Sequence, residues 1–162
     1  MQTELSEICK ECGMCCDGTL FGKAPIDEYE LKLVQYFDSE SITEKEGKFY
    51  FKHPCIYFDS CCTVYDKVRP NICTTYFCSP LKKVQQGESE LKDAQEIIKK
   101  ALKYRSEILV IASQIEIYKT FSISQLLKEV LPIINERIKP HHELWLKLIG
   151  FQSILAKIIG SK

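Results

Sequence analysis

The spacing of apolar residues changes character near the middle of the chain, and from there onward it follows a helical pattern. Apolar side chains recur at alternating intervals of three and four residues, which is typical of an amphipathic helix. The pattern predicts one long helix over about residues 89–119, with Arg105 interrupting its apolar seam. That seam consists of Leu91, Ala94, Ile98, Ala101, Ile108, Ala112 and Ile115.

Two further helices are expected towards the C-terminus. The first is predicted over Leu126–Ile138, with Ser122 or Ser124 as its N-cap and a bend at Pro132. Pro140 ends it, and a last helix follows. The apolar face of that last helix consists of Leu144, Leu148, Phe151, Leu155 and Ile158.

The first half of the chain shows only short elements. Asp27 can cap a helix with apolar residues at Leu31, Val34 and Phe37. The alternating, aromatic stretch over residues 47–53 predicts a strand, and another helix is expected to begin near Pro70. The fold class is therefore mainly α with little β.

The cysteines mark the boundary between the two halves. All nine lie between Cys9 and Cys78, ahead of the polar stretch 79–90. We expect residues 1–80 to form a loop-rich, metal-binding module and residues 81–162 to form a helical bundle. The two are expected to pack together as one compact unit.

The helical half allows three interpretations: a bundle that buries its own stripe, a homodimer through the C-terminal helices, or a membrane-surface element. The bundle is the simplest. No apolar run reaches the roughly 20 residues that span a bilayer, and no signal peptide is recognisable, so a cytoplasmic protein is expected. His141 and His142 are expected to be exposed loop residues.

Charge is balanced overall but divided between the halves. Residues 1–80 hold 8 Lys and Arg against 13 Asp and Glu, and residues 81–162 hold 14 against 9. Mutual neutralisation of the halves explains this simply. A basic face for nucleic acid is the alternative, but no basic run with interleaved aromatics is present, so no nucleic-acid partner is expected.

Nine cysteines indicate metal binding. Thiols stay reduced in the cytosol, and an odd number leaves one unpaired in any disulfide scheme. In "CKECGMCC", residues 9–16, two overlapping C-x-x-C pairs can each supply two thiolates to one centre. Gly13 follows the second cysteine, where such a turn often needs a left-handed backbone.

Cys15 and Cys16 are adjacent, so their side chains diverge and cannot easily bind one tetrahedral ion. The adjacency predicts two metal centres or a polynuclear cluster. A bystander or reactive thiol is the alternative, and a strained vicinal disulfide is a third reading. A second group over residues 53–78 holds five more cysteines. Four from each group make eight, which suits two tetrahedral zinc sites or two four-cysteine clusters.

These residues resemble a known family. "CKECGMCC", then Cys55, then "CTVYDKVRPNIC" at residues 62–73 are similar to the CxxCxxCC family of zinc- or iron-chelating proteins. Cys61 stands where the family usually has another residue, and Thr74 where it often has arginine. The resemblance covers about residues 9–78, and Cys61 is accordingly the spare thiol. The predicted metal ligands are Cys9, Cys12, Cys15, Cys16, Cys55, Cys62, Cys73 and Cys78.

The resemblance implies zinc or iron as the cofactor, including an iron–sulfur cluster, because related segments in flagellin lysine N-methylases are associated with one. No glycine-rich loop supports methyl transfer by this chain. Arg69 is expected to offset thiolate charge by hydrogen bonding to sulfur, with a surface salt bridge as the alternative. Tyr65 is expected to pack in the core, and Asp17, Asp59 and Asp66 are expected in turns or caps.

The sequence thus predicts a protein that holds zinc or an iron centre through cysteine thiolates, with helices that bind another protein, rather than an enzyme. The main alternative is an iron–sulfur redox protein or accessory enzyme with an open metal position. A thiol–disulfide enzyme is less favoured, because the C-x-x-C pairs lack the βαβ context of that class.

Overall fold

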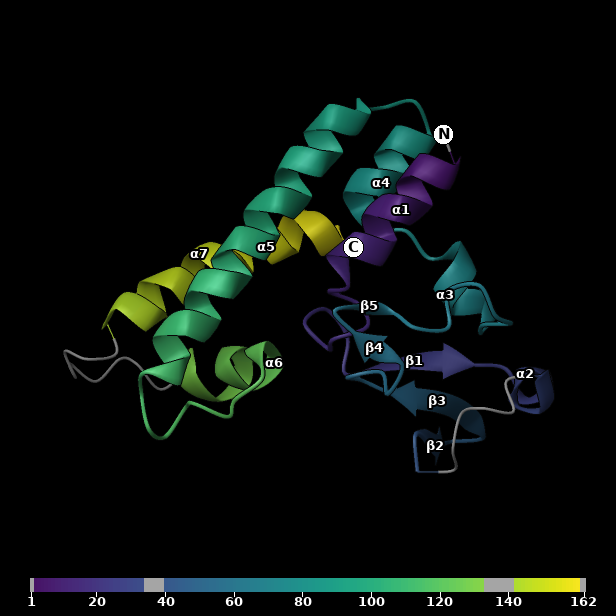
Figure 1. Ribbon diagram of the computed structural model, residues 1–162, viewed down its shortest axis with the longest axis horizontal. Helices are drawn as coiled ribbons and strands as arrows, with labels where there is room; N and C mark the ends of the chain where they lie inside the picture. Colours follow the sequence, from purple (N-terminus) through teal and green to yellow (C-terminus); the bar gives the residue numbers. More distant parts are fainter. Residues whose placement is uncertain (1, 34–39, 133–141, 161–162) are drawn as a thin grey trace. The chain divides into compact units, whose positions relative to one another are not determined.

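The chain divides into two compact units, an N-terminal unit over Met1–Phe77 and a C-terminal unit over Cys78–Lys162. The computed structural model describes residues 2–33, 40–132 and 142–160 (Figure 1). The predicted helical residues Val34 and Phe37, the end of the helix predicted over Leu126–Ile138, Pro140 and His141 lie outside these ranges.

A small antiparallel sheet organises the N-terminal unit. Its strands are β1 (Lys23–Ile26), β2 (Ile42–Lys45) and β3 (Lys48–Lys52), in the order β1-β3-β2. β3 confirms the strand predicted over residues 47–53. β1 and β2 have no counterpart among the predicted elements, because each is only four residues long and offers too few alternating positions. The sheet's buried core is Ala24, Ile26 and Phe51, against which Leu31, Ile42, Phe49 and Ile72 pack.

Short elements complete this unit: α1 (Gln2–Cys12), α2 (Glu28–Leu33), the hairpin of β4 (Phe58–Asp59) and β5 (Cys61–Cys62), and α3 (Asn71–Thr75). α2 begins directly after Asp27 and α3 directly after Pro70, as predicted. α1 has no predicted counterpart. Its last turn carries the first C-x-x-C, so that motif lies on a helix and not in a loop-borne knuckle.

The C-terminal unit is helical. α4 (Ser79–Gln85) packs on both α5 (Leu91–Ser113) and α7 (His142–Ile159), and α5 and α7 pack on each other (Figure 1). Along the chain, α6 (Ile123–Gln125) and a π-helical turn, η1 (Leu126–Val130), connect α5 to α7. Ser122 caps α6 through a reciprocal pair of hydrogen bonds with Gln125, as one of the two predicted caps.

The prediction that the long helix extends to residue 119 is wrong, since α5 ends at Ser113. Its buried seam stops at Ala112, and Ile117 is 63% exposed, so no further turn would be held by packing. Successive i to i+3 backbone hydrogen bonds replace the helix, for example from Tyr118 N–H to the Ile115 carbonyl.

The predicted apolar face of the last helix is confirmed in α7. Leu144, Leu148 and Phe151 are fully buried, with Leu155 and Ile158 beside them. His142 is exposed, but it is the first residue of α7 and not part of a loop. The molecule is thus predominantly helical with little β structure, as expected. Within the described ranges, no helix has the length and apolar character needed to cross a membrane.

Candidate metal centre

The first two cysteines project from the end of α1. Cys9 and Cys12 are three residues apart, which puts them on the same side of the helix. Gly13 ends the helix with a left-handed backbone, φ +62°, as predicted, and its N–H donates to the Cys9 carbonyl at 3.2 Å. A Cβ at Gly13 would lie 2.3 Å from the Phe58 ring, so α1 and the β4–β5 hairpin meet here without space for any side chain.

The turn after Gly13 places Cys16 beside Cys55. The Asp17 N–H donates to the Gly13 carbonyl at 2.9 Å, which closes the turn. The Cys55 N–H then donates to the Cys16 carbonyl at 2.7 Å. Residues 39 positions apart in the sequence are therefore backbone neighbours.

The β4–β5 hairpin separates Cys61 from Cys62. Ser60 turns the chain with φ +55°, and Cys62 pairs with Phe58 while Cys61 pairs with Asp59. Successive side chains in a strand point to opposite faces. Cys61 is exposed and Cys62 half-buried, so the two thiols face different surroundings.

α3 supplies Cys73, and the segment before it supplies Arg69. The Arg69 guanidinium lies over the Tyr65 ring at 4.0 Å, and the Tyr65 hydroxyl donates to the Ser6 carbonyl on α1 at 3.2 Å. The positive charge of Arg69 acts to lower the pKa of Cys73. Tyr65 thus holds Arg69 in place and is only half-buried, a polar role beyond the expected core packing.

Five thiols from these segments act on one another electrostatically: Cys12, Cys16, Cys55, Cys62 and Cys73, the thiol cluster below. Burial, reinforced by Cys55, Cys62, Asp17 and Cys12, raises the pKa of Cys16 to about 12. Burial and then Cys16 and Cys55 raise the pKa of Cys73 to about 12, against the opposing effect of Arg69. Burial also raises the pKa of Cys55.

Cys73 lies at the rim of the thiol cluster. Neighbouring protein atoms raise the pKa of its thiol, yet the residue as a whole is exposed to solvent. Both observations hold if one side of the residue is crowded by the other cysteines and the opposite side faces water.

Three further predicted ligands are Cys9, Cys15 and Cys78. Cys9 and Cys15 are half-buried in the N-terminal unit. Cys78 is buried and belongs to the C-terminal unit, directly ahead of α4, where burial raises the pKa of its thiol. Cys78 therefore lies across the unit boundary from the other eight cysteines.

Three residues near the thiol cluster carry no function in the sequence prediction. Glu30 joins α2 to α3, and Phe58 covers Gly13. His53 packs edge-on against Phe51 at 5.0 Å between ring centroids, and burial lowers the pKa of its imidazole. Phe58 and His53 sit in no recognisable motif. Glu30 could have been recognised as a cap residue, because a Glu three residues after the N-cap Asp27 is a known capping pattern.

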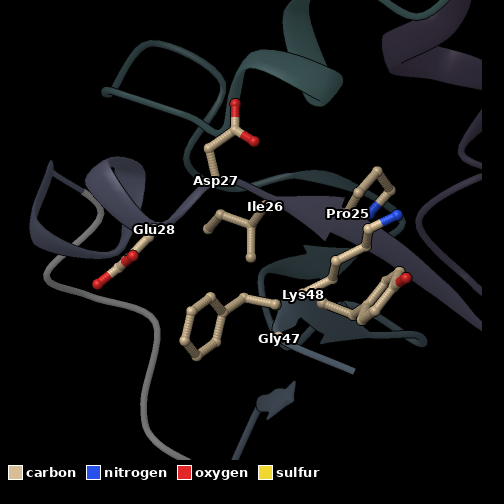
Figure 2. Close-up of a pocket in the computed structure, with 8 residues that line it drawn as sticks. Pro25, Ile26, Asp27, Glu28, Gly47 and Lys48 are labelled. Carbon is tan, nitrogen blue, oxygen red and sulfur yellow. The ribbon is translucent and has the colours of Figure 1, made fainter. Parts of the chain in front are cut away.

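In the described part of the chain, no three His, Cys, Asp or Glu side chains are arranged closely enough to hold a metal ion together. One cavity of about 210 Å³ lies in the N-terminal unit, beside Pro25, Ile26, Asp27 and Glu28 on one side and residues 47–50 on the other. Figure 2 shows the carboxylates of Asp27 and Glu28 pointing away from Ile26. The cavity contains no cysteine and is separate from the thiol cluster.

Comparison with known proteins yields no match to this chain among family models, curated proteins or solved structures. The resemblance to the CxxCxxCC family therefore stays a prediction from the motif.

Proposed function

We propose that the N-terminal unit binds a thiophilic metal, zinc or iron, through cysteine thiolates. One observation carries the proposal: three separate segments bring five thiols within electrostatic reach of one another. Burial first, and then the neighbouring cysteines, oppose ionisation and raise the pKa values of Cys16 and Cys73. A bound cation supplies the opposite charge, so the same five thiols become favourable ligands once a metal is present.

The donor set fits a soft or borderline metal. Thiolate sulfur selects zinc, copper(I) and iron–sulfur centres over hard cations such as magnesium and calcium. Within the thiol cluster, protonated sulfurs do not attract one another, so metal binding has to draw them inward as it removes their protons. Arg69 then offsets part of the negative charge of the thiolates, in line with its expected role beside sulfur.

Two centres stay part of the proposal. Cys16 belongs to the thiol cluster, and its neighbour Cys15 would serve a second centre. Cys61 is the spare thiol, a role that suits its exposed position opposite Cys62 in β5. The helical C-terminal unit would offer the surface for a protein partner, through a homodimer or a different chain.

A second candidate function is an iron–sulfur redox protein or accessory enzyme. The rim position of Cys73 favours it, because a ligand exposed to solvent leaves an approach to the metal open. Absorption in the visible range from anaerobically purified protein would support this function. Stoichiometric zinc and no colour, from cells replete with iron, would count against it.

The decisive experiment is metal analysis of anaerobically purified protein with single Cys→Ser changes. Cys16→Ser should remove at least half of the bound metal, because Cys16 is central to the thiol cluster. Cys61→Ser is the matched control in the same unit and should bind as the unaltered protein does. Full metal content in the Cys16→Ser protein would contradict the proposal.

A further inference from the structure

Glu30 is a buried carboxylate that ties two helices of the N-terminal unit together. It is 6% exposed, and both of its oxygens are engaged. Oε2 accepts from the Asp27 N–H at 2.9 Å at the start of α2. Oε1 accepts from the Asn71 N–H at 2.5 Å, 41 residues away at the start of α3.

The start of α3 needs this partner. Pro70 stands at the N-cap, where its side chain offers no oxygen to the first backbone N–H groups of the helix. Glu30 supplies from another helix the acceptor that an N-cap side chain usually supplies. A carboxylate is also the favoured charge at the start of a helix.

α3 carries Cys73 two residues after Asn71. The Cys73 N–H donates to the Pro70 carbonyl at 2.8 Å, so Cys73 moves with the first turn of the helix. Ile72, next to Asn71, packs against the sheet core. Glu30 and Ile72 therefore hold the first turn of α3 at two points, and only the Glu30 bond is directed.

We propose that Glu30 is the positioning residue of the thiol cluster, which fixes Cys73 for metal binding through the N–H of Asn71. The inference rests on the proposed function. Glu30 acts indirectly, since its oxygens accept from backbone N–H groups and not from the thiols. It sets where α3 begins and hence where the Cys73 thiol stands.

The test is a titration of the reduced, full-length protein with Co²⁺ in the absence of oxygen, followed through thiolate-to-cobalt absorption. Glu30→Ala should weaken Co²⁺ binding on the order of tenfold, the lower end of what loss of a supporting hydrogen bond costs a metal site. Glu30→Gln keeps one acceptor oxygen and should recover part of the affinity. Glu28→Ala, on the exposed side of the same helix, is the matched control and should leave affinity unchanged.

A reciprocal variant removes the donor and leaves Glu30 in place. Asn71→Pro deletes the N–H together with an exposed side chain. Proline is tolerated at the first helical position, and Pro70 already has the extended backbone, φ −50° and ψ 142°, that precedes a proline. Its effect on Co²⁺ affinity should match that of Glu30→Ala. The double variant should be no weaker than either single one, because both delete the same bond.

A second readout does not depend on metal. In the metal-free protein, Glu30→Ala should raise the alkylation rate of Cys73 several-fold relative to Cys61, as measured by peptide mass spectrometry. If the unaltered protein shows no thiolate-to-cobalt absorption, the proposed function fails, and this ratio alone decides the role of Glu30. A folded Glu30→Ala protein with unchanged Co²⁺ affinity would overturn the inference. An unchanged ratio of Cys73 to Cys61 alkylation in the Glu30→Ala or the Asn71→Pro protein would overturn it as well.

Discussion

At the scale of single residues, Gly13 has little room for any side chain. Its backbone is left-handed, and the Phe58 ring occupies the place of a Cβ. Gly13→Ala should therefore cost more than the roughly 1 to 2 kcal/mol of a left-handed alanine, because Phe58 must also move. Denaturant unfolding of the metal-free protein measures the loss.

Gly47 provides the control for this prediction. It has a similar backbone, φ +71°, but nothing lies within 4 Å of a Cβ built there. Gly47→Ala should show the backbone cost alone. Equal losses for the two variants would mean that Phe58 yields freely, and that the contact between α1 and the hairpin is not tight.

The raised pKa values of the cluster thiols predict a stability change at alkaline pH. A group whose pKa is raised in the folded state stabilises the fold below its unfolded pKa and loses that effect as pH rises towards its folded pKa. For Cys16 these limits are 9.0 and about 12. The metal-free protein should therefore lose stability above about pH 9.

Cys16→Ser isolates this effect, because serine has a similar shape and does not titrate in this range. Its stability, followed by thermal unfolding from about pH 8 to about pH 11, should decline less than that of the unaltered protein. Metal should reverse the trend, since it binds thiolates and its affinity rises with pH. Parallel declines with and without Cys16 would exclude the thiol as the cause.

At the scale of elements, α7 shows how far packing decides stability. Leu148 is fully buried in the face that meets α5, whereas Leu146 on the same helix is 53% exposed. Leu148→Ala should destabilise the C-terminal unit by about 2 to 5 kcal/mol, and Leu146→Ala by well under half of that. Circular dichroism during urea unfolding reports both, and a large loss at Leu146 would indicate a covered surface, such as a dimer seam.

Elements with long apolar periodicity or a clear local signal, such as the alternation in β3, could be predicted from the sequence, whereas α1, β1 and β2 could not. The stripe of α7 repeats over 18 residues, so its buried face was predicted except for Ile154. α1 has few apolar residues among its charges, and β1 contains a proline, so tertiary contacts had to define them. The end of α5 was missed because Ile115 and Ile117 continue the period beyond the last turn that packing holds.

The candidate site was predicted only in part. Cysteine spacing identified the thiols, because closely spaced cysteines serve few purposes other than metal binding and disulfide formation. The grouping of Cys12 and Cys16 with Cys55, Cys62 and Cys73 depended on backbone neighbours that spacing does not encode. The hydrogen bond between Glu30 and the Asn71 N–H could not be predicted for the same reason, since the two residues are 41 positions apart.

At the scale of the whole molecule, the two units differ in what holds them together. Among the described residues, the C-terminal unit contains most of the buried apolar side chains, whereas the sheet of the N-terminal unit has a core of three buried residues. Bound metal should therefore stabilise the N-terminal unit more than the C-terminal one.

Calorimetry with and without a chelator tests this prediction. Chelation should lower the melting temperature of one transition, assigned to the N-terminal unit by hydrogen exchange, and leave a second transition in place. A single transition that shifts as a whole would show instead that the units unfold as one body, as the sequence prediction of one compact unit implies.

The bond between the Cys55 N–H and the Cys16 carbonyl has a consequence for how the protein is made. Cys16 leaves the ribosome before Cys55 and its later partners, which extend to Cys73. At about 5 to 20 residues per second, the intervening chain takes roughly 3 to 11 seconds to synthesise. During that interval the thiol cluster is incomplete on the nascent chain, so a metal that needs all five thiols, as proposed, can be bound only after translation has passed α3.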